Sequence, residues 1–383
     1  MKKIVQTAGI LLLTSFWSMA QFYTPGDTLL LQGQLSARSH YNPGNAYPVQ
    51  LGGRYIPQLN YEVRWPERRQ LDFEASANLY GYSNWRDLHD PSMHGKIKPY
   101  RSWARYSTRQ LEMRLGLQKI NFGSAAMLRP LMWFDRIDPR DPLQLTDGVW
   151  GLLGRYYFLN DANIWLWGLW GNNKTKGWEL TKSRKGYPEV GGRMQVPIPY
   201  GEAALTYHHR TADSRDRELM IPSYASIPEN RFGLDVRMDV VVGIWMEGAW
   251  ISKKKDLGYY SNQEMLNAGI DYTFGVGNGL GVTLEHLLAA YDEEAFSFDR
   301  RTSFSALSLS YPLGVFDNLA AIFYRDWTNN QLYSFINWER RYDNITIHLM
   351  AYWNPVHYNL PAQGGTENIF CGKGIQIMLV FNH

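Results

Sequence analysis

Residues 55–80 read YIPQLNYEVRWPERRQLDFEASANLY, and apolar and polar side chains alternate along most of this stretch. In 55–65 the apolar positions include Leu59 and Trp65, and polar or charged residues lie between them. The same alternation begins again after Pro66. A period of two is typical of a β-strand with one apolar and one polar face. The stretch therefore predicts two successive strands joined by a turn.

The polar faces of the predicted strands carry charges of both signs. Residues 230–240 repeat the pattern, with Leu234 and Met238 on one face and Asp235 and Arg237 on the other. In a soluble sandwich the polar face would meet water and the apolar face would fill a core. Charges of both signs on so many successive strands fit better with a polar lumen and a lipid-facing exterior. This pattern favours a transmembrane β-barrel.

Eighteen candidate strands can be placed along the chain, an even number, as in bacterial single-chain barrels. Every second connection is short, and most of the others are long. We therefore predict an all-β fold, an antiparallel up-and-down barrel of about 18 strands with short periplasmic turns and long extracellular loops. The candidate strands are 28–41, 55–65, 71–81, 98–107, 111–121, 149–158, 162–171, 188–197, 201–211, 230–240, 243–252, 265–274, 280–288, 302–311, 318–326, 332–341, 345–354 and 374–383. The long connections are 82–97, 122–148, 172–187, 212–229, 253–264, 289–301 and 355–373.

The first twenty residues resemble a secretory signal peptide. Lys2 and Lys3 form a basic start, residues 8–17 are mostly apolar, and Ser18 and Ala20 are small residues at the positions that a signal peptidase requires. We expect residues 1–20 to be removed and residues 21–383 to form a single barrel domain. The expected location is the outer membrane of a Gram-negative bacterium.

The composition excludes several other classes of protein. A mean hydropathy of −0.38, without an apolar run near 20 residues, excludes a helical membrane protein. An aromatic content of 15% excludes a disordered chain, and a single cysteine, Cys371, excludes a disulfide framework. Removing Lys2 and Lys3 from 39 basic residues leaves 37 against 36 acidic ones, so the mature chain lacks the strongly basic surface that nucleic acid requires.

The connection at 122–148 has the composition of an ordered element. Its centre, residues 129–142, reads RPLMWFDRIDPRDP and is too apolar and aromatic for a solvated loop. A loop of this length in a compact protein is usually functional or disordered, and its composition argues against disorder. We expect Trp133 and its neighbours to anchor it to the barrel wall while its charged residues enter the lumen. The candidate constriction residues are Arg129, Trp133, Asp135, Arg136, Asp138, Arg140 and Asp141.

At this loop the chain resembles outer-membrane porins, in which the third external loop folds inward to form the constriction. The segment GLQKINFG at 116–123, followed by RPLMWFDRIDPRDP, also looks like the strand-and-loop signature of large substrate-specific porins, including those that handle uronic-acid polymers. The many Trp and Tyr residues and the short Asp- and Asn-containing turns are similar to porins of Bacteroidota. The last strand, 374–383, with Phe381 near the terminus, resembles the signal by which such barrels are recognised for insertion.

Charged positions on the polar faces are candidates for the lining of the lumen. Opposite charges on neighbouring strands also stabilise a sheet as ion pairs, which is the more frequent role of any single residue. With both signs present, we expect a transverse field and a weak overall ion preference. The candidate lumen-lining residues are Arg64, Arg101, Arg105, Arg114, Arg155, Glu62, Glu74 and Glu112.

No enzymatic pattern stands out. His208 and His209 are adjacent on a strand and point to opposite faces, so they do not share a metal. Gly275, Gly277 and Gly279 precede a strand rather than the helix that would bind phosphate. A lipase with Ser and His on neighbouring barrel strands stays an open alternative, as does calcium at the acidic positions of residues 129–142. The favoured interpretation has no catalytic residue, metal or cofactor.

Two functions remain after these exclusions. The first is a porin for the passive, selective diffusion of small hydrophilic solutes, with anions and carbohydrates as candidate classes. The second is a barrel scaffold that binds partner proteins of an outer-membrane complex without transport. The expected partners are outer-membrane lipid and lipopolysaccharide, small solutes, and either further copies in a homotrimer or partner outer-membrane proteins. The solute, the ion selectivity and the oligomeric state cannot be derived from the residues.

Overall fold

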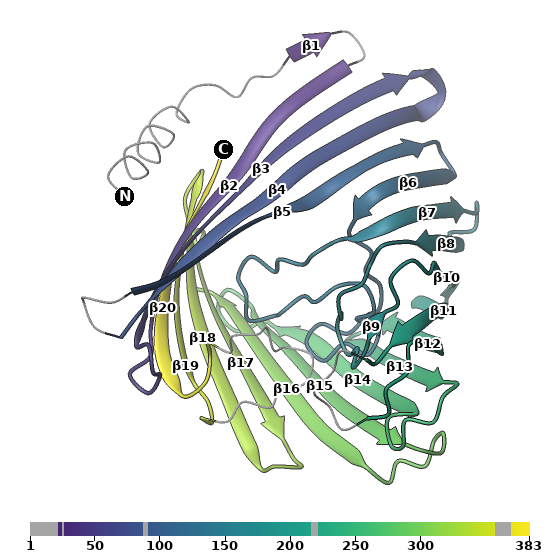
Figure 1. Ribbon diagram of the computed structural model, residues 1–383. Coiled ribbons are helices and arrows are strands. Elements are labelled where there is room, and N and C mark those ends of the chain that lie inside the picture. Colours follow the sequence, from purple (N-terminus) through teal and green to yellow (C-terminus); the bar gives the residue numbers. More distant parts are fainter. Residues whose placement is uncertain (1–21, 25–26, 87–90, 216–220, 357–368) are drawn as a thin grey trace.

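A computed structural model describes residues 22–24, 27–86, 91–215, 221–356 and 369–383. The predicted signal peptide, residues 1–20, lies outside the described residues. The described chain forms one sheet of twenty strands, of which eighteen make a closed antiparallel barrel (Figure 1). The barrel closes because β2 pairs with β20, from Gln34 opposite Asn382 to Tyr41 opposite Ile375.

All eighteen predicted strands are present, and their order is the order of the sequence. Each barrel strand pairs with its sequence neighbours in antiparallel register, as an up-and-down barrel requires. The barrel strands are β2 (Asp27–Tyr41), β3 (Val49–Trp65), β4 (Arg69–Trp85), β5 (Pro91–Ser107), β6 (Leu111–Gln118), β7 (Val149–Tyr157), β8 (Asn163–Leu169), β10 (Glu189–Ile198), β11 (Gly201–Asp213), β12 (Ile227–Asp239), β13 (Gly243–Lys253), β14 (Asn262–Phe274), β15 (Leu280–Asp292), β16 (Arg301–Pro312), β17 (Asp317–Asp326), β18 (Gln331–Arg341), β19 (Ile345–Trp353) and β20 (Lys373–Asn382).

Three short elements are not among the eighteen barrel strands. β1 (Phe22–Thr24) pairs with the start of β2, and β9 (Lys182–Ser183) pairs with the end of β11. A 3-10 turn, η1 (Pro66–Arg68), connects β3 to β4. Among the described residues, no helix has the length and apolar character needed to cross a membrane.

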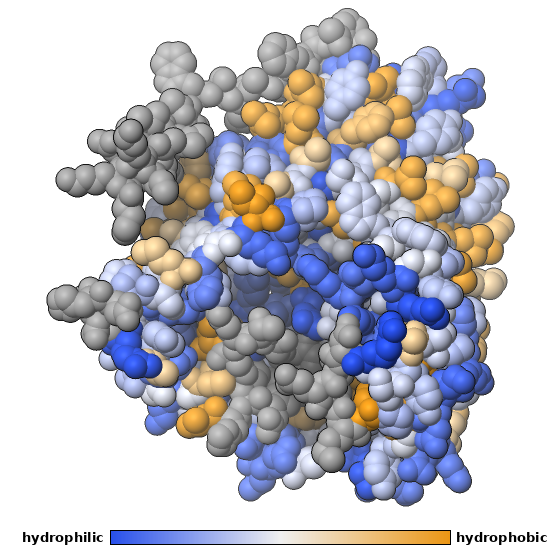
Figure 2. Space-filling model, in the orientation of Figure 1, coloured by the Kyte–Doolittle hydropathy of each residue, from blue (hydrophilic) through white to orange (hydrophobic). Residues whose placement is uncertain are grey.

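Side chains alternate between the two faces of the barrel wall, as the sequence pattern predicts. In β13 the side chains of Trp245, Glu247 and Ala249 are buried, whereas Ile244 and Met246 are exposed on the outside. Figure 2 shows hydrophilic side chains around the hollow in the centre of the view and apolar ones over the neighbouring strands. The outer face is therefore largely apolar, and the inner face carries most of the charge.

Some predicted boundaries differ from the structure because several strands are longer than their alternating core. The connection predicted at 82–97 is mostly strand: β4 continues to Trp85 and β5 begins at Pro91. The connection predicted at 289–301 is shortened in the same way, because β15 continues to Asp292. The strand predicted at 111–121 ends earlier, at Gln118, where the chain turns into the barrel.

Strand length differs strongly around the barrel. β3, β4 and β5 each have 17 residues, whereas β6, β7 and β8 have 8, 9 and 7. In Figure 1 the long strands form one tall side of the barrel. Residues 119–148, which we call the inner loop, connect β6 to β7. This segment lies in the interior of the barrel (Figure 1).

Candidate functional site

The inner loop crosses the lumen and reaches the opposite wall. Its amide at Ala125 donates a hydrogen bond of 2.6 Å to the carboxylate of Glu247 on β13. The side-chain amide of Asn267 on β14 donates to the carbonyl of Leu128 at 2.9 Å. Both wall residues are fully buried. Because the loop leaves the wall at β6 and returns at β7, these contacts show that it spans the interior.

Glu285, on β15, fixes the same part of the loop with a single carboxylate. One oxygen accepts the amide of Ala126 at 2.6 Å. The other accepts the amides of Met127 at 3.0 Å and Leu128 at 2.6 Å. Amide donors in a turn without regular structure need acceptors when they are buried, and charge-assisted bonds of this kind are among the stronger ones. Glu285 therefore holds three successive residues of the loop against the wall.

Apolar packing holds the centre of the loop. Trp133 is 1% exposed, and its ring lies edge-on to Phe122 at 5.7 Å between centroids. Phe134 packs against Trp167 of β8 and His208 of β11 in the same cluster. The loop thus carries its own aromatic core, continuous with the inner face of the wall.

Arg129 and Asp135 join two parts of the loop in a buried ion pair of 2.8 Å. Both side chains are nearly inaccessible, as is Trp133. We predict that these residues belong to a constriction; in the structure they lie inside the packing of the inner loop. A buried charge persists only with a partner, which accounts for their pairing.

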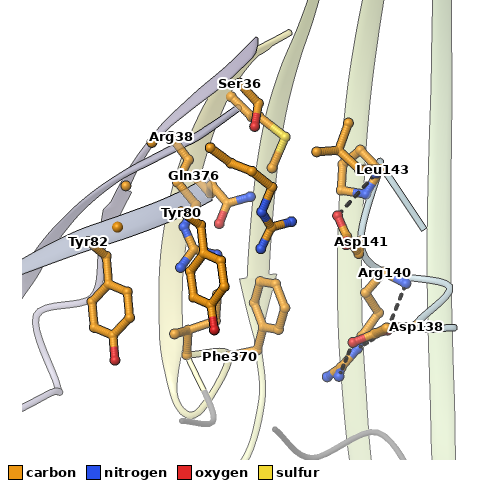
Figure 3. A pocket seen from close by; sticks show the side chains of 17 residues that line it. Ser36, Arg38, Tyr80, Tyr82, Asp138, Arg140, Asp141, Leu143, Phe370 and Gln376 are labelled. Atoms are coloured by element: carbon orange, nitrogen blue, oxygen red, sulfur yellow. Dashed lines mark hydrogen bonds and ion pairs between the residues drawn. The ribbon is translucent and has the colours of Figure 1, made fainter. Parts of the chain in front are cut away.

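The tip of the loop faces the tall side of the barrel. A cavity of about 210 Å³ lies between the segment 138–143 and the inner faces of β2, β3, β4 and β20. Figure 3 shows Arg38, Tyr80 and Tyr82 on one side of this cavity and the acidic tip on the other. Arg54 of β3 also lines it, with its guanidinium 5.5 Å from the centroid of the Tyr80 ring. The barrel interior is therefore narrow here and bordered by opposite charges.

Two carboxylates, those of Asp138 and Asp141, form the acidic side of the cavity, and they differ in their partners. Asp138 accepts two hydrogen bonds from the guanidinium of Arg140, at 2.7 and 2.5 Å. Asp141 accepts the amide of Leu143 at 3.0 Å, and burial raises the pKa of its carboxyl while the positive charge of Arg54 acts in the opposite direction. Asp141 and Arg54 therefore line the same cavity with opposite charges.

The predicted lumen-lining residues of β4 to β7 lie together on the inner face. Glu112 lies within 3.1 Å of Arg114, 3.5 Å of Arg155 and 3.9 Å of Arg105. Arg105 also pairs with Asp72 at 2.9 Å. Glu112, Asp72 and three guanidinium groups therefore form a network of ion pairs on this part of the wall.

The remaining predicted positions are distributed along the same wall. Arg101 is buried and donates to the carbonyl of Thr146 at 3.0 Å, so it supports the inner loop. Glu74 lies beside it on β4, and Glu62 pairs with Arg64 near the short turn that follows β3. Arg136 lies away from the cavity, on the opposite side of the loop.

The sequence argument missed the two basic residues that face the tip. Arg38 and Arg54 lie outside the candidate set, because the second predicted strand begins at residue 55 and the candidates include no residue of the first. Each of them follows or precedes an outward residue, Ala37 or Tyr55, and this alternation identifies both arginines as inward-facing. The partners of Glu247 and Glu285 have no local signal, because they lie more than a hundred residues away.

A second segment, residues 170–181, covers the inner loop and is fixed by buried charges. Glu179 pairs with Arg231 at 2.7 Å and with Arg210 at 3.1 Å. The indole N–H of Trp178 donates to the carbonyl of Arg129 at 2.8 Å. Among the described residues, no group of three His, Cys, Asp or Glu side chains is arranged to hold a metal ion.

Comparison with solved structures places the fold among outer-membrane porins. OccAB4 of Acinetobacter baumannii aligns with a TM-score of 0.56 and 8% identity over 94% of this chain and 98% of its own. OccD3 (OpdP) of Pseudomonas aeruginosa gives 0.58 and 9% over 92% and 91%, and OccK7 (OpdD) of the same species gives 0.52 and 10% over 94% and 99%. At such identities the likeness concerns the fold. The resemblance to Bacteroidota porins stays a prediction. No protein-family model and no curated protein matches the sequence.

Proposed function

We propose that this protein is an outer-membrane porin that admits small hydrophilic solutes by passive diffusion. The observation that carries the proposal is the opening between the tip of the inner loop and the wall formed by Arg38 and Arg54. A loop that only stabilised the barrel would not need charged groups on both sides of this cavity. Here Asp138 and Asp141 face two arginines, and such a transverse field orients a charged or dipolar solute during passage.

The chemistry of the opening favours anionic and hydroxyl-rich solutes. Asp138 is neutralised by Arg140, so Arg38 and Arg54 outweigh the remaining acid. Guanidinium groups bind carboxylates in bidentate geometry. The rings of Tyr80 and Tyr82 lie beside these arginines and offer a surface for the apolar face of a sugar. Charged or acidic carbohydrates combine both features.

In this proposal the candidate constriction residues have different roles. Asp138, Arg140 and Asp141 border the opening. Arg129, Trp133 and Asp135 give the loop a rigid interior, so that its tip stays in place. Arg136, the remaining candidate constriction residue, faces a separate pocket. The ion pairs around Glu112 continue the charged surface along the same wall.

Single-channel recording in planar bilayers tests the proposal. Deletion of residues 137–143 removes the tip but keeps the contacts of Glu247 and Glu285, so we expect stepwise conductance to increase. Deletion of residues 295–299, in the exposed connection between β15 and β16, serves as the control and leaves conductance unchanged. A folded barrel that conducts no ions in either form would contradict the proposal and favour the scaffold function.

The proposed location follows from the barrel and from the predicted leader. Intact-mass measurement of protein purified from the outer membrane is expected to show a chain that begins at Gln21. A homotrimer or a complex with partner outer-membrane proteins is compatible with the apolar outer face. Crosslinking in native membranes separates these forms from a monomer.

A further inference from the structure

The barrel wall is incomplete beside β5. β6 pairs with β5 only at Ser102–Ser107, although β5 begins at Pro91. Within the described chain, no strand pairs with residues 91–101 on that side. β6 and β8 have 8 and 7 residues, fewer than the roughly 9–11 that a strand needs to cross a bilayer. Beside residues 91–101 of β5, the wall consists of loop segments that include residues 145–148 and 171–176.

The free edge of β5 has the features of an edge that stays unpaired. Pro91 and Pro99 lack the N–H that an added strand would need, and Lys96 and Lys98 place charges along the same segment. Prolines and lysines on edge strands prevent pairing with other chains. The gap is therefore better explained as an opening than as a docking site for another strand.

A pocket of about 410 Å³ fills this gap, and we call it the side pocket. Its volume is in the usual range for small-molecule sites, about 300–1,000 Å³. It lies between β5, residues 134–136 and 145–148 of the inner loop, and residues 171–176. The lining residues on which the argument depends are Lys98, Leu117, Arg136, Leu145, Trp150 and Lys174.

The side pocket passes from the outer to the inner face of the wall. Trp150 is 44% exposed on the outer face, whereas Leu117, its partner on β6, is buried. Lys98 is opposite Asn78, whose side chain is buried on the inner face. A pocket lined by both sets of residues reaches through the wall, close to the level at which the short strands end.

Some of the basic side chains that line the side pocket have an acidic partner in the described chain, and others do not. Lys98 forms an ion pair with Asp147. The side chains of Arg136 and Lys174 are exposed and pair with no acidic group of the described chain. Leu117, Leu145 and Trp150 supply an apolar surface beside these two cations. Cations and apolar side chains in the same pocket match a molecule with an anionic head and a hydrocarbon tail.

We infer that the side pocket binds an amphipathic anion, with its carboxylate or phosphate on Arg136 and Lys174 and its tail against Leu117, Leu145 and Trp150. Trp150 is exposed on the outer face of the wall, so the tail has a path to the membrane there. The head meets the two free cations, where charge-assisted hydrogen bonds form. This site lies apart from the opening at Arg38 and Arg54, and its occupancy does not depend on solute passage.

Fluorescence titration of the full-length chain in a nonionic maltoside detergent tests the inference. The probe is 11-(dansylamino)undecanoate, a single-chain carboxylate whose emission rises in apolar surroundings. We expect saturable binding to the wild type and an affinity weaker by at least about tenfold for the double variant Arg136→Glu, Lys174→Glu, because both contacts to the head become repulsive. The matched control, Lys185→Glu with Lys254→Glu, makes the same change of charge at loop positions outside the pocket and keeps wild-type affinity.

Competitors identify the source of the ligand. Displacement by dodecanoate indicates a free single-chain acid, and displacement by solubilised lipid A indicates a membrane lipid; either result supports the site. Equal probe affinity in wild type and double variant would overturn the inference, as would displacement by acetate at the concentration of dodecanoate. Conductance of the same double variant is recorded in parallel, so that loss of binding is distinguished from loss of the channel.

Discussion

At the scale of single residues, Glu285 fixes three successive residues of the inner loop. Its two carboxylate oxygens accept three buried amides, so no water is needed to satisfy residues 126–128. Glu285→Gln keeps the size of the side chain but leaves one acceptor oxygen and introduces donors. An unsatisfied buried amide costs about 1–3 kcal/mol. We expect a lower unfolding temperature on semi-native gels and flickering, larger conductance steps.

Glu294→Gln is the matched control for this change. Glu294 lies in the exposed connection between β15 and β16, and none of the inner-loop amides above is bonded to it. The control is expected to behave as the wild type in both measurements. If Glu285→Gln has quiet, wild-type conductance, the carboxylate does not fix the loop.

Asp141 gives the opening a pH dependence. Burial raises the pKa of its carboxyl, so it becomes neutral at a higher pH than an exposed aspartate does. As pH falls through that raised pKa, the acidic side of the opening weakens and the preference for anions increases. Asp141→Asn is expected to show the increased preference already at neutral pH, and to lose this pH-dependent step in the reversal potential measured across a KCl gradient.

Asp256→Asn removes a carboxylate from an exposed loop and serves as the control for Asp141→Asn. Its reversal potential is expected to follow the wild type at every pH. Identical pH profiles for Asp141→Asn and the wild type would mean that Asp141 does not contribute to the field at the opening.

At the scale of elements, the inner loop and residues 170–181 form one packed unit. Gly177 has a φ of +42°, and a Cβ atom there would overlap the carbonyl oxygen of Met132. Gly177→Ala therefore forces the two segments apart and weakens the bond from Trp178 to Arg129. We expect faster proteolysis within residues 119–148 in the folded barrel, measured by limited digestion and mass spectrometry.

Gly171→Ala separates contact from backbone strain in this experiment. Gly171 also has a positive φ, +79°, but a Cβ atom there meets nothing within 4 Å. Strain from the left-handed backbone is thus common to both variants, and only Gly177→Ala breaks the packing. Equal digestion of the two variants would show that the close approach at Met132 is unimportant.

The elements were predictable where a local period defines them. The alternation from residue 55 to residue 80 predicts two strands because a lipid-facing and a polar face must follow a period of two. The sequence predicts a loop at 82–97 because many of its residues, such as Asn84 and Lys96, are polar, although β4 and β5 extend over most of this region. The path of the inner loop was not predictable, since its acceptors, Glu247 and Glu285, follow it by more than a hundred residues.

At the scale of the whole molecule, closure of the barrel creates the opening. Arg38 and Arg54 belong to β2 and β3, whereas Asp141 comes from the loop after β6. Pairing of β2 with β20 fixes the circumference, and thereby the distance between the two sides. The residue types were visible in the sequence, but their opposition across a lumen depends on eighteen strands closing in register.

Selectivity should therefore follow the sign of the charges on the tall side of the barrel. Arg38→Glu with Arg54→Glu places two acids opposite Asp141, and we expect the reversal potential in a KCl gradient to change from the anion-selective to the cation-selective direction. Arg64→Glu with Arg69→Glu makes the same change of charge at the end of the wall near the η1 turn, where both side chains are exposed, and is expected to shift the potential much less. If the two double variants shift it equally, selectivity arises from the net charge of the lumen, and the opening at the loop tip does not control which ions pass.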